Sequence, residues 1–323
     1  MTKKRIWTYV FLSISFLLLY YVLRDVKYKD FMIQTAKIDF KMVGLASICM
    51  ILSAWFRNLR WLMLFSPLGY KIKKGQAFSA LLLSYPANLV IPQSSFFVRA
   101  SYLRKISGVP FGECLGTIIA EKLMDGLVVF GLFFMFMFSN FSFQISFFKN
   151  FRLYFAILLC GVLIFFASRF FIKTYYQNYW QKVIYLIKSQ LSHFKIGLLT
   201  TKKVENKWLL FLYTVVIWLP YFAIFYFLLK GSVVQDFIDF RLTLELAVMA
   251  NIGWIFPTQG GLGSYHFFIT HIMLSHGFEN LLAVFFAFFS HTFIIFNDVI
   301  LGFYIVLINR RIVLNLFGLK RAI

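Results

Sequence analysis

Long runs of apolar residues, separated by shorter segments rich in lysine and arginine, make up most of this chain. A helix that crosses a membrane needs about 20 apolar residues, because each residue adds about 1.5 Å and the hydrocarbon core is about 30 Å thick. Runs near that length predict six full crossings, and no cleavage motif follows the first, so we interpret it as a retained helix rather than a signal peptide. They lie at residues 6–23, 42–65, 114–138, 151–170, 208–229 and 281–308.

Two further apolar segments are shorter and interrupted. Pro86 and Pro92 break the first, at residues 76–106, and Pro257 breaks the second, at residues 242–275. Proline removes a backbone donor and clashes with the preceding turn, so a helix ends or kinks at each of these points. Non-helical backbone is tolerated at membrane depth only inside protein or beside a water-filled cavity, so we predict two re-entrant hairpins with broken tips. The alternative is that each segment forms two ordinary, short crossings.

The order of these elements predicts how the hairpins face. Three full crossings separate them, and since three is odd, the two hairpins enter the membrane from opposite sides. Opposed broken elements are typical of inverted repeats around a site near the bilayer midplane. The predicted fold is therefore all-α: a polytopic transmembrane helix bundle whose two oppositely oriented re-entrant hairpins form a pseudo inverted repeat, within a single transmembrane domain over residues 1–323.

The charge balance agrees with a membrane protein and orients it. Lysine and arginine outnumber aspartate and glutamate by 33 to 12, and 61% of the residues are hydrophobic. In a soluble protein this excess would suggest nucleic acid, but here the basic residues lie between apolar runs, where cytoplasmic loops face an anionic leaflet. We therefore expect no nucleic-acid partner, a location in the inner (cytoplasmic) membrane, and both termini in the cytoplasm.

Two loops stand out in this arrangement. Residues 24–41 are basic although the scheme places them outside. Residues 171–207 mix aromatic, aliphatic and lysine residues at roughly helical spacing, which predicts a cytoplasmic amphipathic helix on the inner leaflet.

Ionisable residues inside a predicted crossing are candidate functional residues, because a charge in the bilayer is costly. Glu121 and Asp125 are four residues apart, which places them on one face of a helix with Lys122 beside them. Asp125 lies about 15 Å from the cytoplasmic end of its run, near the middle of the bilayer. Two carboxylates so close repel each other unless cations neutralise them, and Lys122 and Arg99 are the expected partners.

Three arginines extend this group. Arg99 follows the break in the first hairpin, and Arg57 and Arg60 lie near the inner end of the second crossing. Arginine binds phosphate through parallel hydrogen bonds, so we predict a site for a phosphate-bearing headgroup in which Glu121 and Asp125 position the cations. Two alternatives use the same residues. One is a buried ion cluster that only locks the bundle, with Arg57 and Arg60 extending to the interface, and the other is a proton-coupled carboxylate.

The break in the second hairpin contains a glycine-rich stretch. Gly260, Gly261 and Gly263 follow Pro257, and glycine permits positive φ and close backbone approach. The stretch either presents backbone amides to an anion or forms a plain turn between two helices.

The remaining motifs predict no cofactor and no metal. Cys49, Cys114 and Cys160 form no CxxC pair, and the chain has no HExxH, P-loop or dinucleotide-binding motif. His291 and Asp298 lie seven residues apart on one face of the last crossing. They are close enough in register to pair, and we interpret such a pair as a polar contact within the bundle rather than as a proton relay.

Several short motifs together resemble a known family. In chain order they are R-x-x-R-W from Arg57 to Trp61, Asn88 with Pro92 and Arg99, a turn at residues 108–111, Glu121-Lys122-x-x-Asp125, and Pro257-x-x-Gly-Gly-x-Gly. Their order and spacing resemble the transmembrane region of lysylphosphatidylglycerol synthases, which also occurs alone as a flippase-like membrane protein. The resemblance covers nearly the whole chain. It implies a helical bundle with re-entrant elements and a role in moving or handling lipids across the inner membrane.

The resemblance does not imply lysyl transfer. Full-length synthases add a cytosolic aminoacyl-transferase domain, which residues 1–323 do not contain, so we expect no enzymatic activity of that kind. The function predicted is a flippase or transporter for an anionic or phosphate-linked lipid, with a membrane phospholipid or lipid-linked substrate as partner and a homo-oligomer left open. Two alternatives are an intramembrane transferase using a polyprenyl-phosphate-linked substrate and a non-catalytic assembly partner. The substrate-binding residues predicted are Arg57, Arg60, Asn88, Pro92, Arg99, Glu121, Lys122, Asp125, Pro257, Gly260, Gly261 and Gly263.

Overall fold

Every secondary-structure element that the computed structural model describes is a helix, which confirms the predicted all-α class. The structure describes residues 13, 15–24, 26–139, 191–232, 239–256, 258–310 and 312. The predicted crossing at residues 151–170, most of the amphipathic segment at residues 171–207, and Pro257 lie outside the described residues.

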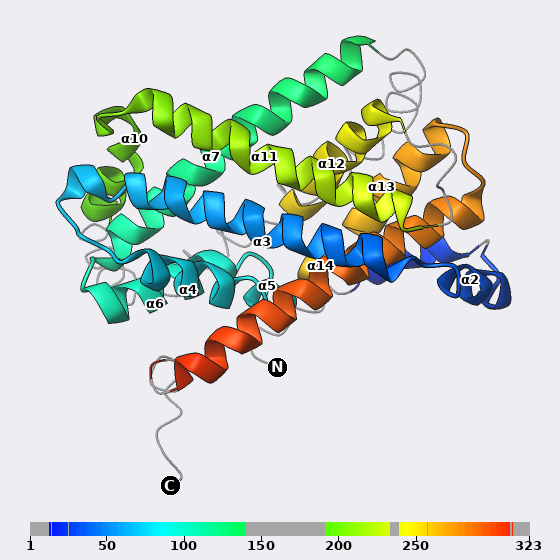
Figure 1. The fold of residues 1–323 in the computed structure, drawn as a ribbon, viewed down its shortest axis with the longest axis horizontal. Helices are drawn as coiled ribbons and strands as arrows, with labels where there is room; N and C mark the ends of the chain where they lie inside the picture. Colours follow the sequence, from blue (N-terminus) through cyan, green and yellow to red (C-terminus); the bar gives the residue numbers. More distant parts are fainter. Residues whose placement is uncertain are drawn as a thin grey trace, which may run out of the picture.

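Four long helices form the frame of the bundle. They are α3 (Phe40–Met63), α7 (Phe111–Ser139), α11 (Lys207–Lys230) and α14 (Asn280–Ile308). Among the described helices, α3, α11 and α14 are long and apolar enough to cross a membrane, α3 being extended by the short helix η1 (Ser66–Leu68). In Figure 1, α3 and α11 run side by side along the long axis of the molecule, and α14 runs at an angle to both.

Polar side chains fix where two of these helices begin. Asp39 precedes α3 and accepts a hydrogen bond from the backbone N–H of Lys41 at 2.8 Å. Asn206 precedes α11 and accepts one from the N–H of Leu209 at 2.8 Å. Such caps satisfy N–H groups of the first turn, which have no partner inside the helix. Both helices therefore start beside the apolar runs predicted at residues 42–65 and 208–229.

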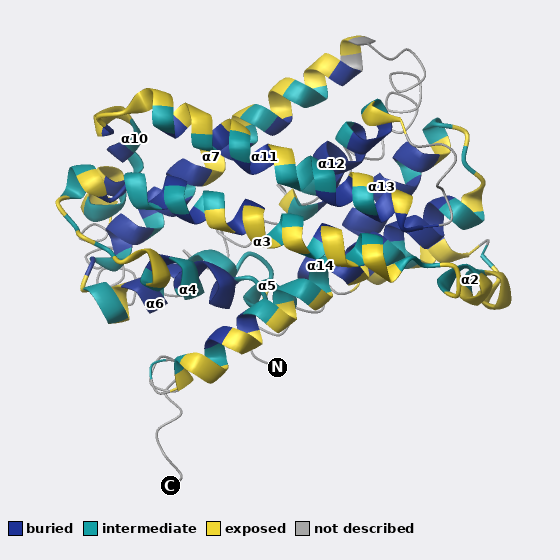
Figure 2. Ribbon diagram, in the orientation of Figure 1, coloured by how far each residue is buried: buried dark blue, intermediate teal, exposed yellow. Residues whose placement is uncertain are grey.

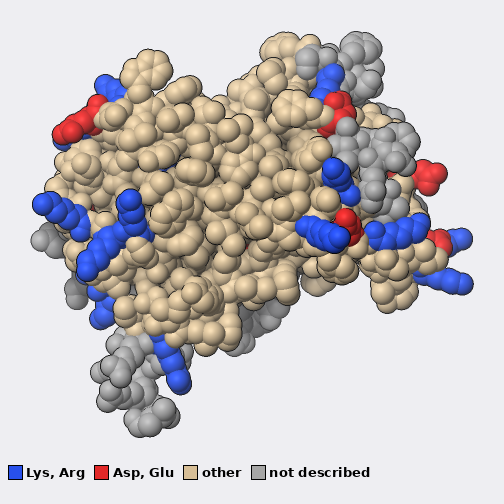
Figure 3. All heavy atoms as spheres, viewed as in Figure 1, with Lys and Arg blue, Asp and Glu red and all other residues tan. Residues whose placement is uncertain are grey.

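The outer surface of the bundle is apolar. Leu127 and Phe138 of α7 are 75% and 82% exposed, and Figure 2 shows exposed residues along the outward sides of the long helices. On the face seen in Figure 3, charged residues gather toward two ends of the molecule and leave an uncharged band between them. A soluble monomer rarely exposes so much contiguous apolar surface, and together with the three spanning helices it identifies an integral membrane protein.

Two helical hairpins fill the space between the long helices. The first consists of α4 (Lys74–Ser84), α5 (Ala87–Val90) and α6 (Ser95–Ser107), and the second of α12 (Phe240–Ile255), η3 (Gln259–Gly261) and α13 (Ser264–Ser275). The arms of each hairpin pack against one another. Their lengths of 11, 13, 16 and 12 residues correspond to about 16–24 Å, which is less than the hydrocarbon core.

The breaks in both hairpins fall where the sequence predicts them. In the first, Pro86 precedes α5, and the chain turns through Pro92 and Gln93, whose φ is 58°. In the second, Gly260 and Gly263 have φ values of 59° and 86°, which confirms the positive φ expected of the glycine-rich stretch. Only glycine adopts such values without strain, so these residues allow the chain to reverse within a few positions.

The two hairpin tips meet in the middle of the molecule. The amide Nε2 of Gln259 donates to the carbonyl oxygen of Leu89 at 2.8 Å, and Nε2 of Gln93 donates to that of Trp254 at 3.1 Å. In Figure 1 the α4–α6 arms lie toward one end of the long axis and the α12–α13 arms toward the other. Re-entry into a membrane and an inverted repeat remain predictions, with which short arms and touching tips agree.

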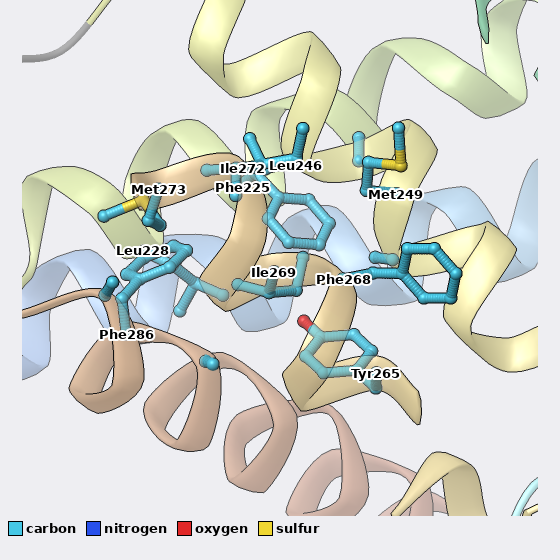
Figure 4. Packing of buried hydrophobic residues seen from close by; sticks show 14 of the residues in the cluster. Phe225, Leu228, Leu246, Met249, Tyr265, Phe268, Ile269, Ile272, Met273 and Phe286 are labelled. Carbon is cyan, nitrogen blue, oxygen red and sulfur yellow. The ribbon is translucent and has the colours of Figure 1, made fainter. Parts of the chain in front are cut away.

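Each hairpin has its own apolar core. In the half that contains the second hairpin, side chains from α11, α12, α13 and α14 interlock, as Figure 4 shows for Phe225, Leu246, Ile269 and Phe286. In the other half, Trp61 of α3 is fully buried among residues of α4, α6 and α7. Inside a bilayer the favourable free energy of helix association comes from close packing rather than from removing apolar side chains from water. Shape complementarity therefore decides how well these helices associate.

Gly302 of α14 allows the last helix to contact the first hairpin tip. A Cβ atom at this position would lie 2.5 Å from Cγ and 2.8 Å from Cδ of Pro86. We expect Gly302→Ala to lower the free energy of unfolding by about 1–3 kcal/mol, because neither backbone can move away freely. Thermal unfolding in detergent measures this effect.

The matched control is Gly131→Ala in α7, where no atom lies within 4 Å of an added Cβ. This variant is expected to be more stable than the wild type by about 0.5–1 kcal/mol, because alanine favours helix. Equal melting temperatures for the two variants would contradict a tight contact between α14 and the tip.

Candidate functional site

A cavity of about 440 Å³ lies where the two hairpin tips meet. Residues of both hairpins line it, together with residues of α3, α7, α11 and α14. Its polar and charged walls include Arg57, Asn88, Arg99, Glu121, Lys122, Asp125, Asn251, Thr258 and Asp298. The volume falls within the range of about 300–1,000 Å³ that is usual for ligand sites.

Asp125 binds two arginines of α3. Its Oδ2 lies 2.5 Å from Nη1 of Arg57, and its Oδ1 lies 2.7 Å from Nη2 of Arg60. Arg57 and Arg60 are three residues apart and therefore project from the same side of α3. The pair of contacts joins α3 to α7 in the interior of the bundle.

Glu121 lies one turn before Asp125 and binds the third arginine. Its Oε2 accepts from Nη2 of Arg99 at 2.9 Å, and its Oε1 is 3.3 Å from Nη1 of Arg57. The Glu121 side chain is fully buried, so its charge depends on these cations. Glu121 thereby ties α6 of the first hairpin to α3 and α7.

Neighbouring side chains hold the arginines in place. The Arg99 guanidinium carbon lies 3.7 Å from the centroid of the Trp61 ring, a cation–π contact, and Trp61 Nε1 donates to Oγ1 of Thr117 at 3.1 Å. Nη1 of Arg60 donates to Oγ1 of Thr214 on α11 at 3.4 Å. The cluster therefore reaches four helices of the bundle.

Two expectations about these charges were wrong. Arg57 and Arg60 do not extend to the membrane interface, because Asp125 holds both inside, and the Arg60 side chain is 0% exposed. Lys122, expected to neutralise the carboxylates, forms no ion pair within 4 Å with any described residue. Its Nζ lies 6.0 Å from the centroid of the Phe96 ring at the cavity wall. Adjacent residues on a helix point about 100° apart, so Lys122 cannot share the face of Glu121.

The cluster carries more positive than negative charge. Within the cluster, Arg57, Arg60, Arg99 and Lys122 outnumber Glu121 and Asp125 by two, and Asp298 is a third carboxylate of the cavity wall. Three of the four cations line the cavity, Arg60 being the exception. In a low-dielectric interior, cations in excess of the carboxylates that they contact favour an anion beside them.

The residues of the first tip shape the cavity rather than carry charge. Oδ1 of Asn88 accepts from the backbone N–H of Ser95 at 3.0 Å, which supports the start of α6. Asn88 also lines the cavity, whereas Pro92 does not. Pro92 therefore acts through the break that it imposes on the backbone.

The glycines of the second tip divide into two groups. Gly260 and Gly261 line the cavity, but the Gly261 N–H points at the carbonyl oxygen of Thr258 at 3.4 Å. Gly263 is not in the cavity wall: an added Cβ there would lie 2.6 Å from the carbonyl oxygen of Ser15, in the helical segment at residues 15–23. Of the three glycines predicted to face an anion, only Gly260 and Gly261 line the cavity. Gly263 instead allows close packing against the helix that contains Ser15.

Histidine contacts differ from those that the sequence suggests. His291 does not pair with Asp298: its Nε2 lies 2.8 Å from the carbonyl oxygen of Gly260 in the second tip. The His291 ring also lies 4.4 Å, centroid to centroid, from that of His266. Residues seven apart are separated by about 10 Å along a helix, which exceeds hydrogen-bonding distance. Sequence spacing cannot indicate the contact between His266 and His291, because the two residues lie on different helices, α13 and α14.

Two more buried carboxylates lie away from the cavity. Glu113 contacts Nδ1 of His193 at 2.8 Å, and Glu245 contacts Nε2 of His276 at 2.7 Å. Burial, reinforced by a hydrogen bond to Glu113, raises the pKa of Tyr70 in the loop before α4. These contacts hold helix ends together, and neither carboxylate lines the cavity.

Fold and site together define an α-helical integral membrane protein with a cavity between two helical hairpins, lined by both cations and carboxylates. Within that class, the chain belongs to the family of the lysylphosphatidylglycerol synthase transmembrane region, whose model matches residues 9–302. This confirms the resemblance inferred from the motifs. No curated protein and no solved structure matches the chain.

The ion cluster generates a stability prediction. Asp125→Asn leaves Arg57 and Arg60 without their closest anion, and we expect the free energy of unfolding to fall by about 3–5 kcal/mol. Adding Arg60→Met to this variant removes one uncompensated charge and is expected to restore part of the loss. Thermal unfolding in detergent compares the variants.

The control is Asp30→Asn in α2 (Tyr28–Thr35), an exposed aspartate, which should change stability by no more than about 0.5 kcal/mol. Unfolding of Asp125→Asn at the wild-type temperature would show that the cluster does not hold the bundle together.

Proposed function

We propose that this protein binds the headgroup of an anionic or phosphate-bearing lipid in its central cavity and carries the lipid across the inner (cytoplasmic) membrane. The observation that carries the proposal is the excess of cations over carboxylates in the ion cluster beside the junction of the two hairpin tips. Ion pairs account for Arg57, Arg60 and Arg99, whereas Lys122 stands beside them with no carboxylate partner among the described residues and is available to an anion.

Arg57 has hydrogen-bond donors left for an anion. It reaches Glu121 and Asp125 through Nη1, and no described residue accepts a hydrogen bond from its Nε or Nη2. Its side chain is 17% exposed and lines the cavity. Arginine and phosphate form charge-assisted, often bidentate hydrogen bonds, so the free edge of Arg57 suits a phosphodiester.

Lys122 supplies a second cation with no structural partner. It lies on α7 at the wall of the cavity, and its ammonium group faces the Phe96 ring, 6.0 Å from the ring centroid, without an ion pair to any described residue. A mobile ammonium group beside the fixed guanidinium groups of Arg57 and Arg99 would complete the coordination of a phosphate.

The hairpins provide a means of movement. Hydrogen bonds from Gln93 and Gln259 join the two tips directly across the site. In transporters with opposed broken elements, one half rocks against the other around a fixed midplane site. We infer the same motion here, with both termini in the cytoplasm and one transmembrane domain.

Lys122→Gln tests the headgroup site, because Lys122 holds no other helix in place. Wild-type protein purified in mild detergent is expected to retain one phosphate-bearing lipid above its bulk membrane fraction, measured by mass spectrometry of co-purified lipids. Lys122→Gln should reduce that enrichment about tenfold, since a charge-assisted hydrogen bond contributes about 1.5–3 kcal/mol. The melting temperature should stay within a few degrees of the wild type.

Lys203→Gln in α10 (Thr200–Lys203) is the matched control, because Lys203 is an exposed lysine outside the cavity. Arg99→Ala should also lose the enrichment, together with some stability through the loss of its contact with Glu121. A lipid profile equal to that of the bulk membrane in the wild type and both cavity variants would instead favour a non-catalytic assembly partner.

A further inference from the structure

Asp298 of α14 is a third carboxylate in the wall of the cavity. Unlike Glu121 and Asp125, which bind arginines, it forms no hydrogen bond and no ion pair with any residue that the structure describes. The amide of Asn251 does not bind it either, because its Nδ2 donates to the carbonyl oxygen of Ala247 at 2.9 Å. The ion cluster therefore does not explain why a carboxylate lies here.

Asp298 lies on the face of α14 that contacts both hairpin tips. Gly302 adjoins Pro86 of the first tip, and His291 binds the Gly260 carbonyl of the second. Asp298 is four residues from Gly302 and seven from His291, so the three share one face of the helix. A movement of either tip against α14 therefore changes the surroundings of this carboxylate.

The surroundings of Asp298 favour its protonated form. Tyr85, Tyr221 and Ile295 line the cavity with it, and none of them can neutralise a negative charge. The other charged side chains of the wall are Arg57 of α3, Arg99 of α6, and Glu121, Lys122 and Asp125 of α7. An ionised carboxylate without a partner is costly inside a membrane, so Asp298 holds a proton while the tips enclose the cavity.

The chemistry of the position suits a proton better than a metal ion. A hard metal cation needs several oxygen ligands, whereas a proton needs one carboxylate oxygen. Among the residues that the structure describes, no group of three or more histidine, cysteine, aspartate or glutamate side chains is arranged to hold a metal ion.

We infer that Asp298 is a proton-binding site that couples the movement of the hairpin tips to a proton gradient. The carboxylate takes a proton from water while the cavity opens to one side, and the carboxyl group releases it to water on the other. An anion bound at Arg57 and Lys122 repels an ionised Asp298, so the proton and the headgroup favour each other's binding. The inference rests on the proposed function and gives it an energy source.

Labelling with dicyclohexylcarbodiimide tests the proton site without a transport assay. A protonated carboxyl group gives its proton to a carbodiimide nitrogen while its oxygen bonds to the central carbon, and the product rearranges to a stable N-acylurea that mass spectrometry locates. We expect label on Asp298 of the purified wild type that decreases as the pH rises, because the ionised form does not react. Glu121 and Asp125 are internal controls, since their arginine partners keep them ionised and unlabelled.

Two results of the labelling would overturn the inference. One is the absence of label on Asp298 at every pH. The other is protection of Asp298 by sodium chloride but not by choline chloride, which would show a site for a sodium ion instead.

Proton entry into liposomes tests the coupling. The protein is reconstituted with phosphatidylethanolamine and phosphatidylglycerol around a pH-sensitive dye, and an inside-negative potassium diffusion potential draws protons in. We expect the wild type to acidify the interior faster than protein-free liposomes. Asp298→Asn, which keeps the size of the side chain, should lower the rate to that of protein-free liposomes.

Two further variants control for structure. Asp298→Glu keeps the carboxylate and should retain proton entry, and Asp30→Asn in α2 should match the wild type, because Asp30 is exposed and far along the chain from the cavity residues. Equal rates for the wild type and a folded Asp298→Asn would refute the coupling.

These results separate the inference from the proposed function. If Lys122→Gln loses the co-purified lipid while Asp298 takes no label, the headgroup site stands and the proton site fails. If Asp298 takes the label but Lys122→Gln keeps the lipid at the wild-type level, the proton site stands and the proposed headgroup site fails.

Discussion

Two carboxylates on one face of α7 and three arginines from α3 and α6 neutralise one another in the interior of the helix bundle. In a low-dielectric interior each of these charges is costly alone, so the helices that carry them must stay together. Glu121 and Asp125 thereby fix the first hairpin against α3 and α7. The same pairing leaves Arg57 with unused donor groups and Lys122 without a carboxylate partner among the described residues, and we propose that an anion binds there.

The last helix connects this cluster to the second hairpin. Along one face of α14, Gly302 contacts the first tip, Asp298 opens into the cavity, and His291 binds the second tip. A shift of either hairpin against α14 would therefore change the distance between the cationic wall and Asp298. In our account, the opposed tips form one site because α14 supports both.

Local sequence patterns predicted the fold class, the broken segments and the paired carboxylates, because each depends on spacing within one helix. The breaks at Pro86 and Pro92 and the positive φ of Gly260 depend only on residue type, because proline ends a helix and glycine permits positive φ. The partners of the carboxylates do not, since Arg60 meets Asp125 only after α3 packs on α7. For the same reason Lys122 was wrongly expected to neutralise the carboxylates. It is their neighbour in the chain, but it points away from the helix face that they share. Contacts between helices, including that of His291 with the second tip, required the three-dimensional structure.

We propose that the cations between the hairpin tips hold a lipid phosphate. The most direct measurement is an electron cryo-microscopy structure of the wild type in nanodiscs made of phosphatidylethanolamine and phosphatidylglycerol. We expect density for a phosphate within hydrogen-bonding distance of Arg57 and Lys122, with acyl chains leaving the cavity toward the bilayer. A cavity that holds only water, with ordered lipids confined to the outer surface of the bundle, would contradict it.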